Sequence, residues 1–249
     1  MGEGGGSVSL DHVGRALPLF PLGTVLFPGL VLPLHVFEER YRALVRDIMD
    51  LPADDGREFG VVAIRQGWEV EHPTGPDGEP VGPPSPAPVT LHDIGCTAEV
   101  RQVAEHPDGR FDIVTVGRRR FRVEKVDQGS APYLTAQVEY LDESVGEPGL
   151  AEYLAPRVLA SFRRYLGLIG PDSPANAEQL PEDPTVLSHL VAATAMLTID
   201  ERQRLLATAD TAARLRDELV ILEREAGLLL RVRAVPVPLS QLAVPPAPN

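Results

Sequence analysis

The chain has 249 residues, of which 43% are hydrophobic and 24% are charged, a composition typical of a globular protein with a sizeable core. Its net charge of −13 argues against a nucleic-acid coat and against binding to an anionic membrane surface, because both need a basic face. The single cysteine, Cys96, excludes an intramolecular disulfide framework and a cysteine-based zinc cluster. No apolar run reaches the roughly 18 residues of a transmembrane helix.

Three segments have the composition of tails or loops. Residues 1–14 are Gly-rich and are predicted to form a disordered tail. Residues 71–90 and 233–249 are Pro-rich, which predicts an extended loop and a second tail, because proline cannot donate to a sheet ladder. The first residues show neither the basic nor the apolar region of a secretory signal, so we expect a cytoplasmic protein.

Residues 15–142 are predicted to be rich in β-structure. A Pro-Asp-Gly turn at 106–110 indicates a hairpin, and apolar residues at helical spacing predict one helix over 37–49. Gly117 separates two predicted strands. Short apolar runs and period-two alternation predict strands at 17–20, 30–34, 59–66, 94–100, 111–116, 121–126 and 134–140.

After a break at 142–149 the apolar period changes to that of a helix, and residues 150–232 are predicted to hold four helices. The first is predicted to end at Gly167. The chain is therefore expected to be α+β, with a β-rich lobe followed by a C-terminal helical bundle.

Two helix starts have specific signals. Asp183 is a predicted N-cap, and Pro184 follows at the first helical position, where its missing N–H costs nothing. Thr198 and Glu201 have the spacing of a capping box.

The stretch LPLFPLGTVLFPGLVLPLHVFEERY at 17–41 resembles the start of the Lon N-terminal domain, the substrate-binding region of ATP-dependent Lon proteases. FGVVAI, LHDIGCTAEV, GRRRFRV, PYLTAQVEYL and LTIDERQRLLATAD continue the resemblance in order, and it covers about residues 17–231. It implies a stand-alone form of this domain, in which residues 15–142 form a PUA-like lobe, or pseudo-barrel, and residues 150–232 form the bundle.

The sequence lacks the residues that Lon's catalytic modules need. A phosphate-binding loop requires a Gly-Lys pair, but the only lysine, Lys125, lies within Val-Glu-Lys-Val. A Ser-Lys peptidase requires a desolvated lysine as base, and neither Lys125 nor the nearest serine, Ser130, lies in a peptidase-like motif. We therefore predict no enzymatic activity, no catalytic residue and no cofactor.

The resemblance implies binding of unfolded or specific protein segments, with a protease or chaperone system as a wider partner. We expect an extended polypeptide at the junction between the two lobes, where two surfaces can bury one segment. The apolar residues near the turns at 20–30 either fold back into the core or form an exposed patch, and the sequence leaves both possibilities open. The candidate peptide-binding residues are Phe20, Leu22, Phe27, Leu30, Arg40, Tyr41 and Arg120.

Two alternative functions rest on weaker signals. A cluster of arginines at 118–122 could contact RNA, but residues 1–142 carry 13 cations and 22 acids, and phosphate contacts in that field would be weak. A structural role is favoured for these arginines, with one of them paired to an acid such as Glu38. A small hydrolase would need a cluster of residues with perturbed pKa values, which no spacing in the sequence predicts.

The six histidines show no metal-ligand spacing, so no metal site is predicted. His35 and His92 lie near apolar runs and are predicted to be hydrogen-bonded residues at the edge of the core. Cys96 alternates with Ile94 and Ala98, which predicts a buried, inert thiol. The sequence leaves the partner's identity and the oligomeric state open.

Overall fold

The fold is that of a computed structural model, which describes residues 16–52, 56–66, 90–169 and 180–232. The predicted tails and nearly all of the predicted loop at 71–90 lie outside the described residues. The described part is α+β, as expected. Its strands are β1 (Leu17–Leu22), β2 (Val31–Val36), β3 (Glu58–Gln66), β4 (Thr90–Leu91), β5 (Ile94–Glu105), β6 (Phe111–Asp127) and β7 (Thr135–Tyr140).

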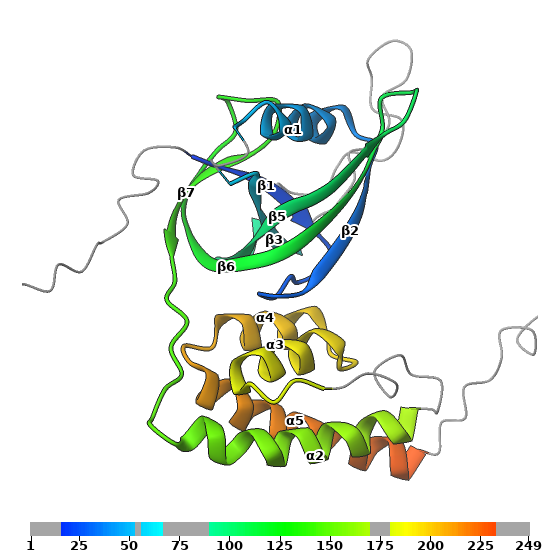
Figure 1. The fold of residues 1–249 in the computed structure, drawn as a ribbon, viewed down its shortest axis with the longest axis vertical. Helices are drawn as coiled ribbons and strands as arrows, with labels where there is room; N and C mark the ends of the chain where they lie inside the picture. The colour runs from blue at the N-terminus through cyan, green and yellow to red at the C-terminus, as the bar shows by residue number, and fades with distance from the viewer. Residues whose placement is uncertain (1–15, 53–55, 67–89, 170–179, 233–249) are drawn as a thin grey trace, which may run out of the picture.

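The strands form one sheet in the order β1-β7-β6-β5-β3-β4, and β2 pairs separately with β6. Because β1 is antiparallel to β7 and parallel to β3, the sheet closes on itself. The helix α1 (Glu39–Met49) packs at one end of this closed sheet, and the other helices lie at the opposite end (Figure 1).

The strand β6 is continuous, whereas the sequence predicted two strands separated at Gly117. The Gly29 N–H donates to the Gly117 carbonyl at 2.8 Å, and the Gly117 N–H donates to the Leu30 carbonyl at 2.9 Å. A side chain at position 117 would collide with the Phe27 carbonyl. The glycine therefore marks a close approach of two backbones within a strand rather than the end of a strand.

The hairpin between β5 and β6 confirms the predicted turn. The Gly109 N–H donates to the His106 carbonyl at 2.8 Å, and Gly109 has a φ of 78°, which suits glycine. On β5 itself, Cys96 is fully buried as predicted, and burial raises the pKa of its thiol. The thiol is therefore protonated and unreactive at neutral pH.

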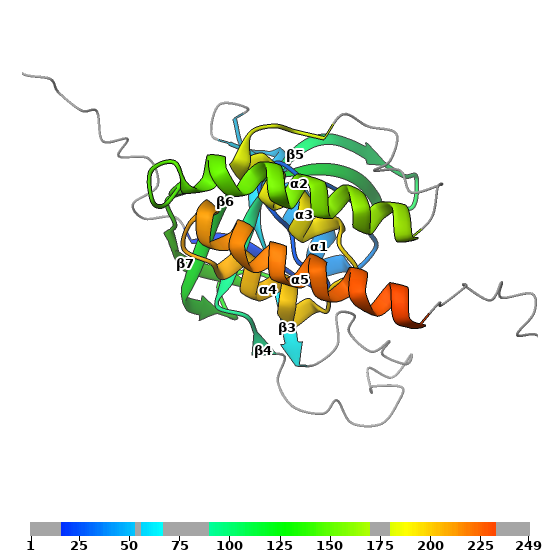
Figure 2. The same cartoon turned by 90° about the horizontal axis from the view of Figure 1, so that it is seen from below.

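Four helices follow the sheet. They are α2 (Leu150–Ile169), α3 (Pro184–Thr194), α4 (Ile199–Ala207) and α5 (Thr211–Val232). The helices α2 and α5 lie side by side, and α3 and α4 lie between this pair and the sheet (Figures 1 and 2). No helix in the described ranges is both long and apolar enough to cross a bilayer.

Local signals placed two of these helices correctly. The Asp183 carboxylate accepts the Val186 N–H at 2.9 Å, and Thr198 and Glu201 form a complete capping box. The helix α2, however, continues past Gly167 to Ile169. Ile169 packs against the helical core, and this burial outweighs the low helix propensity of the glycine.

The two layers share a small apolar core. Phe27 is fully buried there, between residues of the sheet and residues of α3 and α4. The connection between β1 and β2 contributes Val25 and Phe27, the strands β3 and β5 contribute Ala63 and Ile94, and the helices contribute Ala192, Leu205 and Leu206. Phe20, Leu22 and Phe27 are therefore core residues, whereas Leu30 in the same stretch is only half-buried.

Replacing Phe27 by Ala is expected to lower the free energy of unfolding by about 3–5 kcal/mol, because the surrounding side chains would line a cavity. Urea denaturation measures the loss. Phe37→Ala is the matched control, because Phe37 is 49% exposed and should cost much less. Equal losses in the two variants would contradict the placement of Phe27.

Candidate functional site

A cavity of about 630 Å³ lies between the sheet and α3. We call it the junction cavity. Its walls come from the turn before β2, the middle of β6, the segment after β7 and the first turns of α3. The lining residues are Pro28, Gly29, Leu30, Arg118, Arg119, Arg120, Leu141, Asp142, Glu143, Leu180, Pro181, Thr185, Val186, His189 and Leu190.

The side of the junction cavity formed by Arg120, Glu143 and His189 contains a network of buried charges. The Arg120 Nε donates to Glu143 Oε2 at 2.9 Å, and the Arg214 Nη2 donates to Glu143 Oε1 at 2.8 Å. His189 Nε2 lies 3.4 Å from the same Glu143 oxygen. Arg120 is 2% exposed and Arg214 is fully buried. One carboxylate therefore links β6 to α5.

Arg120 also binds the end of α4. Its Nη1 donates to the carbonyls of Leu206 and Thr208, at 2.9 and 2.6 Å. The last carbonyls of a helix have no partner within the helix and carry partial negative charge, so a guanidinium group stabilises them. A single side chain of the sheet thus fixes the C-terminus of α4 against the sheet.

The network keeps Glu143 ionised. Burial raises the pKa of this carboxyl, but hydrogen bonds from His189 and Arg214 and the charge of Arg214 outweigh it and lower the pKa to about 2. Burial lowers the pKa of His189, so its imidazole is neutral at neutral pH. Glu143 is therefore a carboxylate held between two guanidinium groups at every physiological pH.

Five of the candidate residues are buried. Phe20, Leu22 and Tyr41 belong to the sheet's apolar core with α1, where the Phe20 and Tyr41 rings stack with centroids 4.0 Å apart. Phe27 lies in the core between the layers, and Arg120 lies in the charge network. Arg120 nevertheless lines the junction cavity, and Phe20, Leu22 and Tyr41 line a separate pocket of about 200 Å³ beside β2 and the start of α1.

The other two candidates lie apart. Arg40 is half-buried and pairs with Glu38 at 2.9 Å, at the start of α1. Leu30 is half-buried and lines the junction cavity. Of the seven candidates, the structure therefore brings only Leu30 and Arg120 together at this cavity.

The predicted pairing of an arginine in the cluster with an acid is found, but the acid that pairs with Arg120 is Glu143, whereas Glu38 was the example expected from the sequence. Each remaining arginine of the cluster also has an acidic partner. Arg118 pairs with Glu99, Arg119 with Glu58 and Arg122 with Glu139.

Sequence reasoning missed the helical wall of the junction cavity. Val186 and Leu190 lie one turn apart on α3, and Val186 is 53% exposed. The N-cap at Asp183 placed Val186 in the first turn of the helix, which was a usable signal. The sequence could not show which strand faces Val186 and Leu190 across the cavity, because that depends on how the two layers pack.

Glu143→Gln should lower the free energy of unfolding by about 3–5 kcal/mol at pH 7, because two buried arginines lose their carboxylate. Since the folded-state pKa is depressed, this stabilisation is present above pH 4.5 and is lost as the pH falls toward 2. The difference between the variant and the parent should therefore shrink across that interval in urea titrations.

Glu139→Gln is the control for this test, because Glu139 is half-exposed and pairs with the exposed Arg122. Its loss should stay within about 1 kcal/mol. If Glu143→Gln cost no more than Glu139→Gln, the network would not hold the layers together.

The comparisons with known proteins identify the family. The model of the ATP-dependent protease La (LON) substrate-binding domain matches residues 16–224. Lon protease 2 of Myxococcus xanthus is 29% identical over 229 residues, which are 90% of this chain and 25% of that protein. Lon protease 2 of Herpetosiphon aurantiacus is 32% identical over 217 residues, covering 86% of this chain and 24% of that protein. The chain thus spans about a quarter of the length of these curated relatives.

Two solved structures of Lon N-terminal domains are also similar to this chain. A Lon N-terminal domain protein from Xanthomonas campestris is 26% identical, with a TM-score of 0.51, over 83% of this chain and 98% of that one. The N-terminal domain of Mycobacterium avium complex Lon protease shares the fold, with a TM-score of 0.53 at 19% identity over 86% of this chain and 98% of that one. The chain therefore belongs to the family of LON substrate-binding domains.

Proposed function

We propose that the chain binds extended protein segments in the junction cavity and catalyses no reaction on them. The cavity itself carries this proposal, because its volume of about 630 Å³ suits several residues of a peptide. Leu30, Leu141, Val186 and Leu190 offer apolar contacts on facing walls. Such contacts favour peptides with apolar side chains, and the net charge of −13 disfavours strongly acidic ones.

The fold supports this proposal through its two layers. We propose that the closed sheet is a PUA-like pseudo-barrel over residues 15–142, and that α2–α5 are a bundle over residues 150–232. The segment between them forms part of the cavity wall. A protease or chaperone system that receives the bound segments, and a cytoplasmic location, belong to the same proposal.

The surroundings of Lys125 and of the polar residues in the junction cavity support a non-catalytic role. Lys125 is exposed on β6, whereas a lysine that acts as a base must be desolvated. At the junction cavity, the Thr185 hydroxyl is 3.0 Å from the Thr211 hydroxyl, and His189 Nε2 faces Glu143 and Arg214. Among the described lining residues, no hydroxyl or thiol is hydrogen-bonded to a base, as the hydrolase alternative would require.

The RNA-binding alternative is disfavoured by the pairing of the arginine cluster. Arg118, Arg119 and Arg122 would each have to leave a carboxylate before contacting phosphate, and Arg120 is buried. Replacing a carboxylate partner by a phosphate gains each arginine little free energy, because the negative net charge of the protein also repels the phosphates. Retention on heparin at moderate salt would favour the alternative.

Val186→Asp should weaken the binding of an apolar, unstructured casein peptide at least tenfold, or ~1.4 kcal/mol, because it places a charge on an apolar wall. Fluorescence anisotropy of the labelled peptide measures this change. An acid in the first turn of α3 suits the helix dipole, so the variant should remain folded.

Val220→Asp is the matched control, because Val220 is 65% exposed on α5 and lies outside the cavity lining. It should leave the affinity unchanged. Equal affinity of the peptide for the parent and Val186→Asp would place the binding surface elsewhere.

The pure chain is expected to leave casein intact in the presence of ATP and Mg²⁺, because it has neither a phosphate-binding loop nor a buried lysine base. Gel analysis over time tests this directly. ATP-dependent degradation that Lys125→Ala abolishes would overturn the non-catalytic role.

A further inference from the structure

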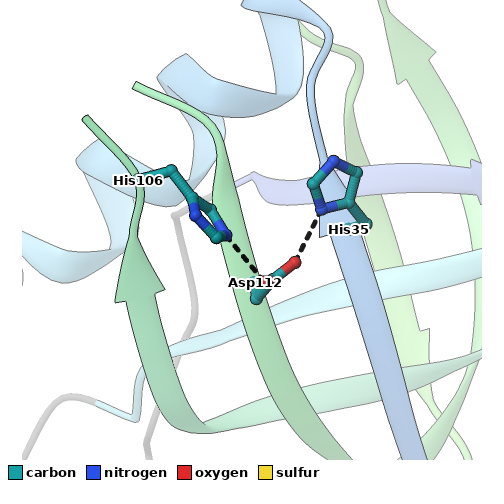
Figure 3. A group of neighbouring side chains, drawn as sticks. All are labelled: His35, His106 and Asp112. Atoms are coloured by element: carbon teal, nitrogen blue, oxygen red, sulfur yellow. Dashed lines mark hydrogen bonds and ion pairs between the residues drawn. The ribbon is translucent and has the colours of Figure 1, made fainter. Parts of the chain in front are cut away.

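Three side chains converge at the end of the sheet that carries the β5–β6 turn. His35 Nδ1 lies 2.6 Å from Asp112 Oδ1, and His106 Nε2 lies 2.7 Å from Asp112 Oδ2. The three potential ligand atoms lie within 4.8 Å of one another, and both rings point toward the carboxylate (Figure 3). His35 is exposed, contrary to the core-edge position expected from the sequence, and no spacing in the sequence signalled this cluster.

The backbone fixes the positions of all three residues. His35 on β2 is directly opposite Asp112 on β6 in the antiparallel ladder. His106 follows the last residue of β5, and its N–H donates to the Arg110 carbonyl at 2.8 Å, within the tight turn. Because the ladder and the turn are both hydrogen-bonded, the side chains converge without ordering a flexible loop.

We propose that His35, His106 and Asp112 bind a divalent transition ion such as Zn²⁺, with water at the fourth position. Two imidazoles and one carboxylate suit ions of the zinc class, whereas Ca²⁺ and Mg²⁺ prefer oxygen ligands throughout. Three protein ligands and an open position are also the arrangement that zinc adopts where it binds a further molecule.

The adjustment that the ion requires is small. Zinc bonds of about 2.0–2.2 Å in a tetrahedral site place neighbouring ligand atoms roughly 3.3 Å apart. Each imidazole now meets a different oxygen of Asp112, at 2.6 and 2.7 Å, and the three candidate ligand atoms lie within 4.8 Å of one another, so the side chains must shift by about one ångström to reach that spacing. All three side chains are between 40% and 54% exposed, so solvent gives them room for this shift.

The protons can also be accounted for. A carboxylate oxygen only accepts hydrogen bonds, so each ring nitrogen that faces Asp112 carries a proton, and this proton must leave that nitrogen when the ion binds. The carboxylate is already an anion, because hydrogen bonds from His35 and then His106 hold the pKa of Asp112 below its usual range. The ion thus replaces two hydrogen bonds with three coordinate bonds.

Titration of the full chain with ZnCl₂ in a calorimeter, followed by Co²⁺ and its visible absorption, tests the site. The parent should bind one ion reversibly, and EDTA should remove it. His35→Ala, His106→Ala and Asp112→Asn should each weaken binding by about 10–100-fold or more, since even losing an outer partner of a metal ligand costs that much. Zn²⁺ should raise the melting temperature of the parent but not of these variants.

The double variant His12→Ala/His72→Ala is the matched control, because it removes two histidines that lie outside the described residues. It should bind Zn²⁺ like the parent. The proposal is overturned if the control loses binding, if the parent shows no saturable binding, or if the three variants bind as tightly as the parent. Circular dichroism without metal checks that the exposed substitutions leave the fold intact.

Discussion

Two buried arginines that share one carboxylate determine how the sheet and the helices are arranged. Arg120 and Arg214 come from different layers, and Glu143 lies in the segment that joins those layers. Removing such charges from water costs several kcal/mol each, and only well-placed partners offset this cost. Backbone carbonyls at the end of α4, the Asp142 carbonyl and the Ser188 hydroxyl supply further acceptors. Because few relative positions of the layers satisfy all these donors, the network also sets the width of the junction cavity.

A second buried acid, Glu218, helps to show which groups stabilise the charges of the two arginines. Glu218 lies one turn beyond Arg214 on α5, and its carboxyl oxygens have no hydrogen-bond partner among the described residues. Burial raises the pKa of Glu218 well above its usual range, which favours the neutral form of this carboxyl. Glu143 and the carbonyls therefore stabilise both guanidinium groups without help from Glu218. The position of an acid relative to its donors, rather than the number of acids nearby, decides which one ionises.

The sequence predicted what local chemistry controls and missed what packing controls. Capping at Asp183 and Thr198 depends on residues three positions apart, so both helix starts were predictable. The partner of Arg120 and the continuity of β6 through Gly117 depend on backbone from distant parts of the chain. The sequence could not show whether the apolar residues at 20–30 are buried, because apolar residues beside turns are common both in cores and in surface patches.

The two proposed sites lie at opposite ends of one strand pair. The β2–β6 ladder pairs Val31 with Val116 and continues without a shift to Val36 and Phe111. Leu30, just before this ladder, lines the junction cavity, whereas His35 is near its other end. Coupling between sites requires an element with two alternative arrangements that both ligands bias. An unbroken ladder is a single rigid arrangement, so a metal ion at His35 would fix the hairpin end without altering the peptide affinity of the junction cavity.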